Sequence, residues 1–238
     1  MTALSLILPC YNEADRLPAT LATYLAHLPD GPDDAEVLVV DDGSADATAK
    51  VAGAIGDARV RVIRTRPNHG KGFAVRTGML AATGDLLVFT DADGAYVPGD
   101  MDQVVRALAL APVAIGTRGP DASAPLIRRV ASRAFNQALH LLSDLPFTDT
   151  QCGLKAFRRE AAQQLFGRAK VNGFAFDVEL LLLARQLGLP VAEVPVRAQS
   201  RFGSRVRVLA DGRRMLGEIW SMRRDLDADH RSQRRAYV

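Results

Sequence analysis

The sequence predicts an α/β fold in which helices flank a mainly parallel central sheet within one domain. Short apolar runs alternate with helical runs through the first half of the chain, the pattern of repeated strand–helix–strand units. The run Glu36–Asp41 is apolar between its two acids, as expected of a strand covered on both faces. Of the 238 residues 48% are hydrophobic and 24% charged, with a mean hydropathy of +0.01, which excludes disordered, collagen-like and coiled-coil proteins.

The first half is expected to contain four strands that alternate with three helices. Pro9 closes the first strand, Ser44 or Asp46 can cap the second helix, and Gly84 follows the third. In chain order the expected elements are Leu4–Leu8, Ala14–Leu28, Glu36–Asp41, Ala45–Ile55, Val60–Arg64, Lys71–Ala82 and Asp85–Thr90. Right-handed crossovers bring the carboxyl ends of the four strands to one edge of the sheet, where ligands of such sheets bind.

The second half is less regular and ends in a basic segment. Its expected strands and helices are, in chain order, Val113–Gly116, Ala124–Ser143, Phe176–Leu187, Pro190–Arg197 and Val208–Arg224. Residues 195–238 carry 11 arginines and 5 acids, so the basic character of the chain lies in this tail. Such a segment suits phosphate groups, an anionic membrane surface or nucleic acid, and equally an ordinary solvated surface.

The chain is expected to reside inside the cell. Cys10 and Cys152 are too few for a disulfide framework. The segment Met1–Pro9 lacks the basic start of a signal peptide. No apolar run approaches the roughly 18–20 residues that a membrane-spanning helix needs.

Asp91-Ala92-Asp93 is the sharpest chemical signal. Its two carboxylates directly follow an apolar strand, so both can approach one hard cation at the ligand-binding edge. Mg²⁺ and Mn²⁺ favour oxygen ligands, and Mg²⁺ is usually held by one or two carboxylates plus substrate phosphates. The cation would act as a Lewis acid on a diphosphate leaving group. A solvated loop is the alternative interpretation of the same three residues.

Residues after the other strands add to this picture. Lys71 opens a helix from a glycine-bracketed turn, where lysine and helix amides both suit a phosphate. Asp41 or Asp42 could accept hydrogen bonds from a base or ribose or could serve a turn, and Tyr11 could pack on a base or be a partly buried aromatic. The chain has neither a Gly-x-x-x-x-Gly-Lys-Ser/Thr loop nor a Gly-x-Gly-x-x-Gly after the first strand, which excludes P-loop and nicotinamide-binding proteins.

Taken together, these motifs resemble the family 2 glycosyltransferases of the GT-A (Rossmann-like) fold. The motifs are Leu8–Glu13, Val39–Ser44, Asn68–Gly72 and Thr90–Gly94, the last with the Asp-x-Asp (DXD) pattern. Two later segments are similar to the branch that acts on dolichyl and polyprenyl phosphates, most of all to its dolichyl-phosphate β-glucosyltransferases; they are Phe147–Phe157 and Gly173–Leu181. The resemblance covers residues 4 to about 205. It implies a domain 1–207 with a nucleotide-binding half (about 1–94) and an acceptor half (about 95–207), followed by a basic amphipathic helix and tail (208–238).

The resemblance also implies roles for individual residues. Asp93 and Asp91 would hold the metal. The residues implied for the nucleotide sugar are Pro9, Tyr11, Glu13, Asp42, Lys71, Asp91 and Ala92. Those implied for the acceptor phosphate are Arg118, Arg128, Ser132, Gln151 and Arg201. Arg128 and Ser132 stand four residues apart on one predicted helix, so they share a face.

The expected chemistry depends on the acceptor. A phosphate is already anionic and needs no strong general base, whereas a hydroxyl needs one. Asp177 and Glu179 at a helix start could serve as that base, or they could be acids favoured by the helix dipole. The expected catalytic residues are Asp93, Asp91, Arg118 and Asp177. Direct displacement at the anomeric carbon would invert its configuration.

The sequence therefore predicts a Mg²⁺- or Mn²⁺-dependent, inverting hexosyltransferase that moves glucose from UDP-glucose, or next mannose from GDP-mannose, to a polyprenyl phosphate. A soluble hydroxyl acceptor is one alternative. A sugar nucleotidyltransferase is a second, although the segment Cys10–Glu13 is not the glycine-rich basic loop that such enzymes carry after the first strand. A non-catalytic nucleotide-sugar-binding module is a third.

The expected location is the cytoplasm, with no nucleic-acid partner. The basic helix Val208–Arg224 would either lie on the cytoplasmic face of the membrane as a peripheral anchor or pack on the core.

Overall fold

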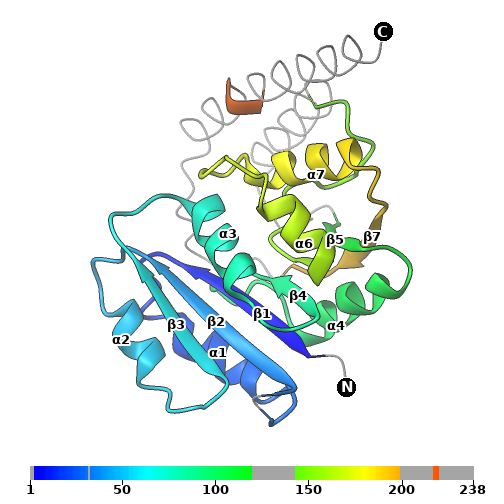
Figure 1. The fold of residues 1–238 in the computed structure, drawn as a ribbon. Helices are drawn as coiled ribbons and strands as arrows, with labels where there is room; N and C mark the ends of the chain where they lie inside the picture. The colour runs from blue at the N-terminus through cyan, green and yellow to red at the C-terminus, as the bar shows by residue number, and fades with distance from the viewer. Residues whose placement is uncertain (1–2, 32, 120–142, 199–216, 220–238) are drawn as a thin grey trace, which may run out of the picture.

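A seven-stranded sheet forms the centre of the computed structural model, which describes residues 3–31, 33–119, 143–198 and 217–219 (Figure 1). The strand order is β3-β2-β1-β4-β6-β5-β7. The strands are β1 (Leu4–Cys10), β2 (Ala35–Asp42), β3 (Val60–Thr65), β4 (Leu86–Phe89), β5 (Val113–Arg118), β6 (Lys155–Arg158) and β7 (Val191–Val196). Only β6 runs antiparallel to its neighbours β4 and β5, so the prediction of a mainly parallel sheet is confirmed.

Helices cover both faces of the sheet (Figure 1). They are α1 (Leu17–Leu25), α2 (Thr48–Gly53), α3 (Lys71–Ala81), α4 (Pro98–Arg106), the short 3₁₀ turn η1 (Ala107–Ala109), α6 (Arg159–Phe166) and α7 (Phe176–Gln186). Successive side chains of a strand point to opposite faces, so Leu6 and Leu8 pack with α1 and α4 while Ile7 packs with α3 and α7. Two apolar cores, one on each face, hold the carboxyl ends of the strands in place.

The elements predicted in the first half all occur, with shifted ends. α1 begins at Leu17 rather than Ala14, with Pro18 in its first turn. α2 begins at Thr48 rather than Ala45, because the preceding residues form a turn in which the Ser44 amide donates to Asp41 Oδ1 and the Asn12 amide donates to Ser44 Oγ. The same turn brings the ends of β1 and β2 together.

Four elements of the second half, α4, η1, β6 and α6, were not predicted. β6 is only four residues long and begins with a lysine, so it lacks the apolar run that marks a buried strand. This strand pairs with β4 on one side and β5 on the other, and Lys155 is left with no exposed surface.

Two predicted helices, Ala124–Ser143 on the acceptor side and the basic helix Val208–Arg224, lie largely outside the described residues. Of Ala124–Ser143, only Ser143 is described. Of Val208–Arg224, only residues 217–219 are described; they are helical, and Ile219 is fully buried in the core beside α7. None of the helices in the described ranges is both long and apolar enough to cross a membrane.

Candidate active site

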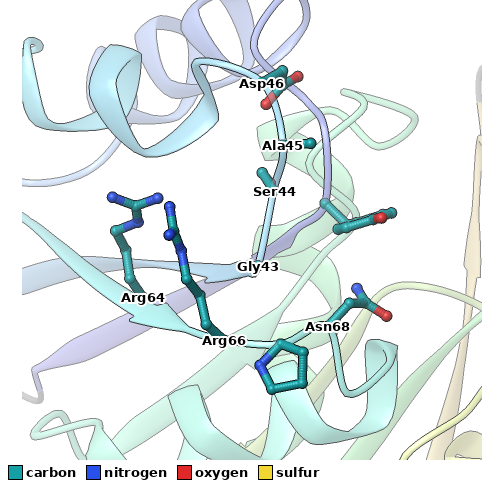
Figure 2. Close-up of a pocket in the computed structure, with 9 residues that line it drawn as sticks. Gly43, Ser44, Ala45, Asp46, Arg64, Arg66 and Asn68 are labelled. Atoms are coloured by element: carbon teal, nitrogen blue, oxygen red, sulfur yellow. The ribbon is translucent and has the colours of Figure 1, made fainter.

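A pocket of about 750 Å³ opens at the carboxyl ends of β1, β2 and β3 (Figure 2). Figure 2 shows Arg64 and Arg66 pointing in the same direction along one side, opposite the segment Gly43–Asp46. The residues that line the pocket are Tyr11, Gly43, Ser44, Ala45, Asp46, Arg64, Arg66, Pro67 and Asn68. Tyr11 lines the pocket and is 46% exposed. The sequence correctly predicted that these strand ends converge.

Asp41, at the end of β2, contacts two of the residues that line this pocket. Its side chain has no exposed surface, and its Oδ1 accepts a hydrogen bond from the Ser44 amide at 3.0 Å. Its Oδ2 lies 3.3 Å from Arg64 Nε, accepts no hydrogen bond and is buried. Asp41 therefore shapes the pocket through Ser44 and Arg64, which line it.

Asp42 shapes the next loop. Its carboxylate accepts hydrogen bonds from Thr65 Oγ1 at 2.8 Å and from the amides of His69 and Gly70 at 3.0 and 2.7 Å. Gly70 has a φ of 111°, and a Cβ there would lie 2.5 Å from the carbonyl oxygen of Asn172. The structure therefore places Asp42 as the residue that folds the turn in front of Lys71, and its predicted contact with a nucleotide stays a prediction.

Lys71, the first residue of α3, and Asp91, just after β4, form an ion pair at the carboxyl ends of the strands, the same end of the sheet as the pocket. Lys71 Nζ lies 2.5 Å from Asp91 Oδ1, and the two side chains are 21% and 30% exposed. Burial works against the ammonium form, but the carboxylates of Asp91 and Asp177 outweigh it and raise the pKa of Lys71. The ammonium form is therefore favoured, and the charge of such a lysine suits an anionic phosphate.

Asp91 and Asp93 are the residues predicted to hold a divalent cation, and this role stays a prediction. No three His, Cys, Asp or Glu side chains gather as metal ligands within the described part of the chain. Two carboxylates completed by ligand phosphates and water are nevertheless the usual environment of Mg²⁺. Gly153 leaves the room that Asp91 occupies, because a Cβ at Gly153 would lie 2.1 Å from Asp91 Oδ2. The Asp93 carboxylate is oriented by the Ala95 amide, which donates to its Oδ1 at 3.0 Å.

Arg118, at the end of β5, is held by Asp149. Asp149 Oδ2 accepts from Arg118 Nε at 2.6 Å, and its Oδ1 accepts from the second guanidinium nitrogen at 3.0 Å. Asp149 Oδ1 also accepts from the Gln151 amide at 3.1 Å, which brings two predicted acceptor residues to one carboxylate. Burial opposes the charge of both partners, but their bonds raise the pKa of Arg118 and lower that of Asp149. Sequence reasoning missed Asp149, although it lies within the motif Phe147–Phe157.

Asp177 lies under the cleft in a second ion pair. Lys155 Nζ donates to Asp177 Oδ1 at 2.5 Å, and the two side chains are 0% and 5% exposed. Burial raises the pKa of Asp177, and the ammonium groups of Lys155 and Lys71 oppose that rise. Glu179 is engaged as well, because it accepts from the amides of Lys170 and Val171 at 2.8 and 2.9 Å. Sequence reasoning missed Lys155.

The other predicted donor residues have structural partners. Pro9 is half-buried in β1. The carboxylate of Glu13 accepts from Arg16 Nε at 2.6 Å, and the carbonyl of Ala92 accepts from Thr20 Oγ1 at 2.9 Å. The predicted acceptor residues Arg128, Ser132 and Arg201 lie outside the described residues.

Comparison with known proteins identifies relatives over most of the chain. The sequence profile described as "Glycosyl transferase family 2" matches residues 5–166. The dolichyl-phosphate β-glucosyltransferase of Drosophila melanogaster is 42% identical over 224 residues, which are 85% of this chain and 69% of that protein. The human protein of the same name is 36% identical over the same shares.

Solved structures show the same fold. The glucosyl-3-phosphoglycerate synthase of Mycobacterium tuberculosis, in complex with UDP, is 25% identical with a TM-score of 0.70, over 93% of this chain and 80% of that one. The same synthase in complex with Mn²⁺, UDP and glucosyl-3-phosphoglycerate is 23% identical with a TM-score of 0.69, over 93% and 80% of the two chains. The central sheet and its helices are thus those of a GT-A fold, as predicted.

Proposed function

The chain belongs to glycosyl transferase family 2, and from this premise we propose that it transfers a hexose from a nucleotide sugar to a polyprenyl phosphate. The proposed donor is UDP-glucose, because the relatives named above are dolichyl-phosphate β-glucosyltransferases and a protein of the same fold binds UDP. The proposed reaction depends on a divalent cation and inverts the anomeric carbon.

The interactions of the two candidate bases, Asp177 and Glu179, favour one kind of acceptor over the other. A hydroxyl acceptor needs a free base, but Asp177 is ion-paired with Lys155 and Glu179 accepts two backbone hydrogen bonds. A phosphate acceptor is already anionic and attacks without such a base. The arrangement of these two carboxylates therefore supports a phosphate acceptor over a hydroxyl acceptor.

The proposed donor site runs from the pocket beside Tyr11 to the Lys71–Asp91 pair. Tyr11 would pack on the base. Lys71 would bind the diphosphate. Asp91 and Asp93 would hold a Mg²⁺ or Mn²⁺ ion, which supplies Lewis-acid neutralisation of the departing diphosphate.

The proposed acceptor site centres on Arg118, with Arg128, Ser132 and Arg201 as further predicted contacts. Asp149 fixes two nitrogens of the Arg118 guanidinium and so orients the group toward a single phosphate direction. An acceptor phosphate oxygen forms the new bond to the anomeric carbon, and the bond from that carbon to the diphosphate breaks with its electron pair. An α-linked donor thereby gives a β-linked product. A lipid acceptor would require contact with a membrane, for which the basic segment 208–224 is the proposed site on the cytoplasmic face.

A partition assay tests this proposal. The protein is incubated with Mn²⁺ or Mg²⁺ and with radiolabelled UDP-glucose or GDP-mannose, in the presence of a short polyprenyl phosphate. Label from UDP-glucose is expected to pass into the organic phase, and the anomeric proton coupling of the product is expected to be that of a β-linkage. Label transferred only to a soluble hydroxyl compound, or label moved equally well in the presence of EDTA, would refute the proposal.

A further inference from the structure

We propose that Lys155, together with Asp177, is a positioning residue that fixes the floor of the donor site from inside the core. The inference rests on the proposed function, because it concerns the same cleft, and it assigns a role to a lysine that touches neither ligand nor solvent. Lys155 is the first residue of β6 and pairs with Phe89 of β4, two residues before Asp91.

The surroundings of Lys155 leave its ammonium few partners. Its side chain has no exposed surface, and its Nζ lies 5.7 Å from the centre of the Phe89 ring. The Nζ donates to the carbonyl oxygen of Cys152 at 2.7 Å and to Asp177 Oδ1 at 2.5 Å. A fully buried lysine is rare and is kept only where its charge is paired and hydrogen-bonded. These two contacts therefore define what Lys155 does.

The first contact fixes the turn Cys152–Gly153, which packs against Asp91. Lys155 holds the Cys152 carbonyl, and the next residue, Gly153, donates its amide to Tyr96 Oη at 3.1 Å. A Cβ at Gly153 would lie 2.1 Å from Asp91 Oδ2, so the backbone of this turn and the Asp91 carboxylate are in direct contact. A shift of the turn would move Asp91.

The second contact fixes the charge beneath Lys71. Asp177 is buried at the start of α7, and the ring centre of the preceding residue, Phe176, lies 6.0 Å from Lys71 Nζ. Two ion pairs, Lys155–Asp177 and Lys71–Asp91, therefore lie on the two sides of Phe176. Lys155 holds Asp177 at the start of α7, and Lys71 binds Asp91. Groups behind the contacting residues of such sites typically change ligand affinity about 10- to 100-fold when they are removed.

The test separates positioning from simple charge neutralisation. Binding of UDP with MnCl₂ is measured by calorimetry, and the melting temperature is measured without ligand. Lys155→Met is expected to lower the melting temperature and to weaken UDP binding about 10-fold or more. The double variant Lys155→Met/Asp177→Leu removes both buried charges, so it is expected to recover most of the melting temperature while UDP binding stays about 10-fold weak.

Arg59→Met is the matched control. Arg59 is also buried, and it forms an ion pair with Asp57. It directly precedes β3, at the amino ends of the parallel strands, whereas the candidate site lies at their carboxyl ends. This variant is expected to lower the melting temperature without changing UDP affinity. Tyr96→Phe leaves every charge in place but removes the acceptor of the Gly153 amide, and it is expected to weaken UDP binding several-fold.

Two results would overturn the inference. One is a double variant that binds UDP with Mn²⁺ as tightly as the unaltered protein, since Lys155 would then only neutralise Asp177. The other, decisive even if the double variant does not fold, is unchanged UDP affinity in Tyr96→Phe. Failure of the unaltered protein to bind any nucleotide with Mn²⁺ would instead refute the proposed function.

Discussion

Two lysine–aspartate pairs lie near the carboxyl end of β4 and differ mainly in exposure. In each pair the ammonium nitrogen lies 2.5 Å from a carboxylate oxygen. The side chains of Lys71 and Asp91 are 21% and 30% exposed, whereas those of Lys155 and Asp177 are 0% and 5% exposed. The same chemical pair can therefore serve a ligand at the surface of the cleft and fix the backbone one layer below it.

Access of solvent determines which of these two roles an ion pair can take. A pair that water reaches can exchange its partner for a phosphate or a cation, and it contributes only about 0–1 kcal/mol to folding. Removing one partner of a buried pair leaves an uncompensated charge, which costs about 3–5 kcal/mol. Substitutions in the exposed pair should thus affect ligands, and those in the buried pair should affect both folding and ligands.

The largest expected effect is that of Asp93→Ala beside the exposed pair. Transfer is expected to fall about 1,000-fold, because a metal ion contributes several kcal/mol of charge stabilisation and each 1.36 kcal/mol is a factor of ten in rate. Mn²⁺-dependent UDP binding should vanish while the melting temperature stays the same. Rates and UDP binding are compared with those of Asp85→Ala, whose carboxylate is 62% exposed beside Arg159. Unchanged turnover in Asp93→Ala would contradict its assignment as a metal ligand.

Lys71→Met is the direct test of the exposed pair against the buried one. It is expected to lower kcat/KM about 10- to 100-fold, by analogy with other charged groups that stabilise a leaving group. Its free energy of unfolding in urea should fall by less than about 1 kcal/mol, whereas Lys155→Met should lose about 3–5 kcal/mol. Equal losses of stability in the two variants would show that exposure does not separate the roles.

Asp149→Asn extends the comparison to the acceptor side. The asparagine keeps the shape of the side chain but loses the charge that holds the Arg118 guanidinium in two places. The KM for the polyprenyl phosphate is expected to rise about 10-fold, since a charge-assisted bond is worth about 1.5–3 kcal/mol. The UDP affinity should not change. Equal rises in the constants for donor and acceptor would contradict a role for this pair in acceptor binding.

The exposed pair could be predicted from the sequence and the buried pair could not. Lys71 and Asp91 each follow a strand of the first half, and the topology of a parallel sheet brings such residues to one edge. Lys155 and Asp177 are 22 residues apart, and Arg118 and Asp149 are 31 apart. Partners so far apart in the sequence form no local pattern, so only tertiary packing brings them together and the sequence does not reveal the pairs.

The second half of the fold was harder to predict for a related reason. β6 is a four-residue strand whose two ends are charged, Lys155 and Arg158, so its pairing with two neighbours overrides its composition. Several first-half strands contain an apolar run, such as Val37–Val40 in β2 and Leu86–Phe89 in β4, and such a run signals burial directly. Sequence patterns therefore predicted the elements that carry their own apolar signal and missed those that only the assembled sheet stabilises.

The smallest expected effect concerns the Asp57–Arg59 pair at the far edge of the sheet. Arg59 Nε and a second guanidinium nitrogen donate to Asp57 at 3.0 and 2.7 Å, and these bonds lower the pKa of Asp57 from 3.8 to about 2. A carboxyl group whose pKa is lower in the folded state stabilises the protein above its unfolded pKa and loses that contribution as the pH falls toward its folded pKa. Since the Asp57 side chain is 25% exposed, solvent screening limits its contribution to about 0–1 kcal/mol.

Asp57→Asn should therefore lower the free energy of unfolding at pH 7 by up to about 1 kcal/mol, with little difference from the unaltered protein near pH 2. Urea unfolding at the two pH values measures this directly. UDP affinity at pH 7 should stay unchanged, because the pair lies at the opposite edge of the sheet from the cleft. A stability difference that is the same at both pH values would mean that the charge of Asp57 contributes nothing. A change in UDP affinity would mean that ion pairs far from the cleft also set its geometry, and the contrast between ligand-binding and structural pairs would then not depend on position.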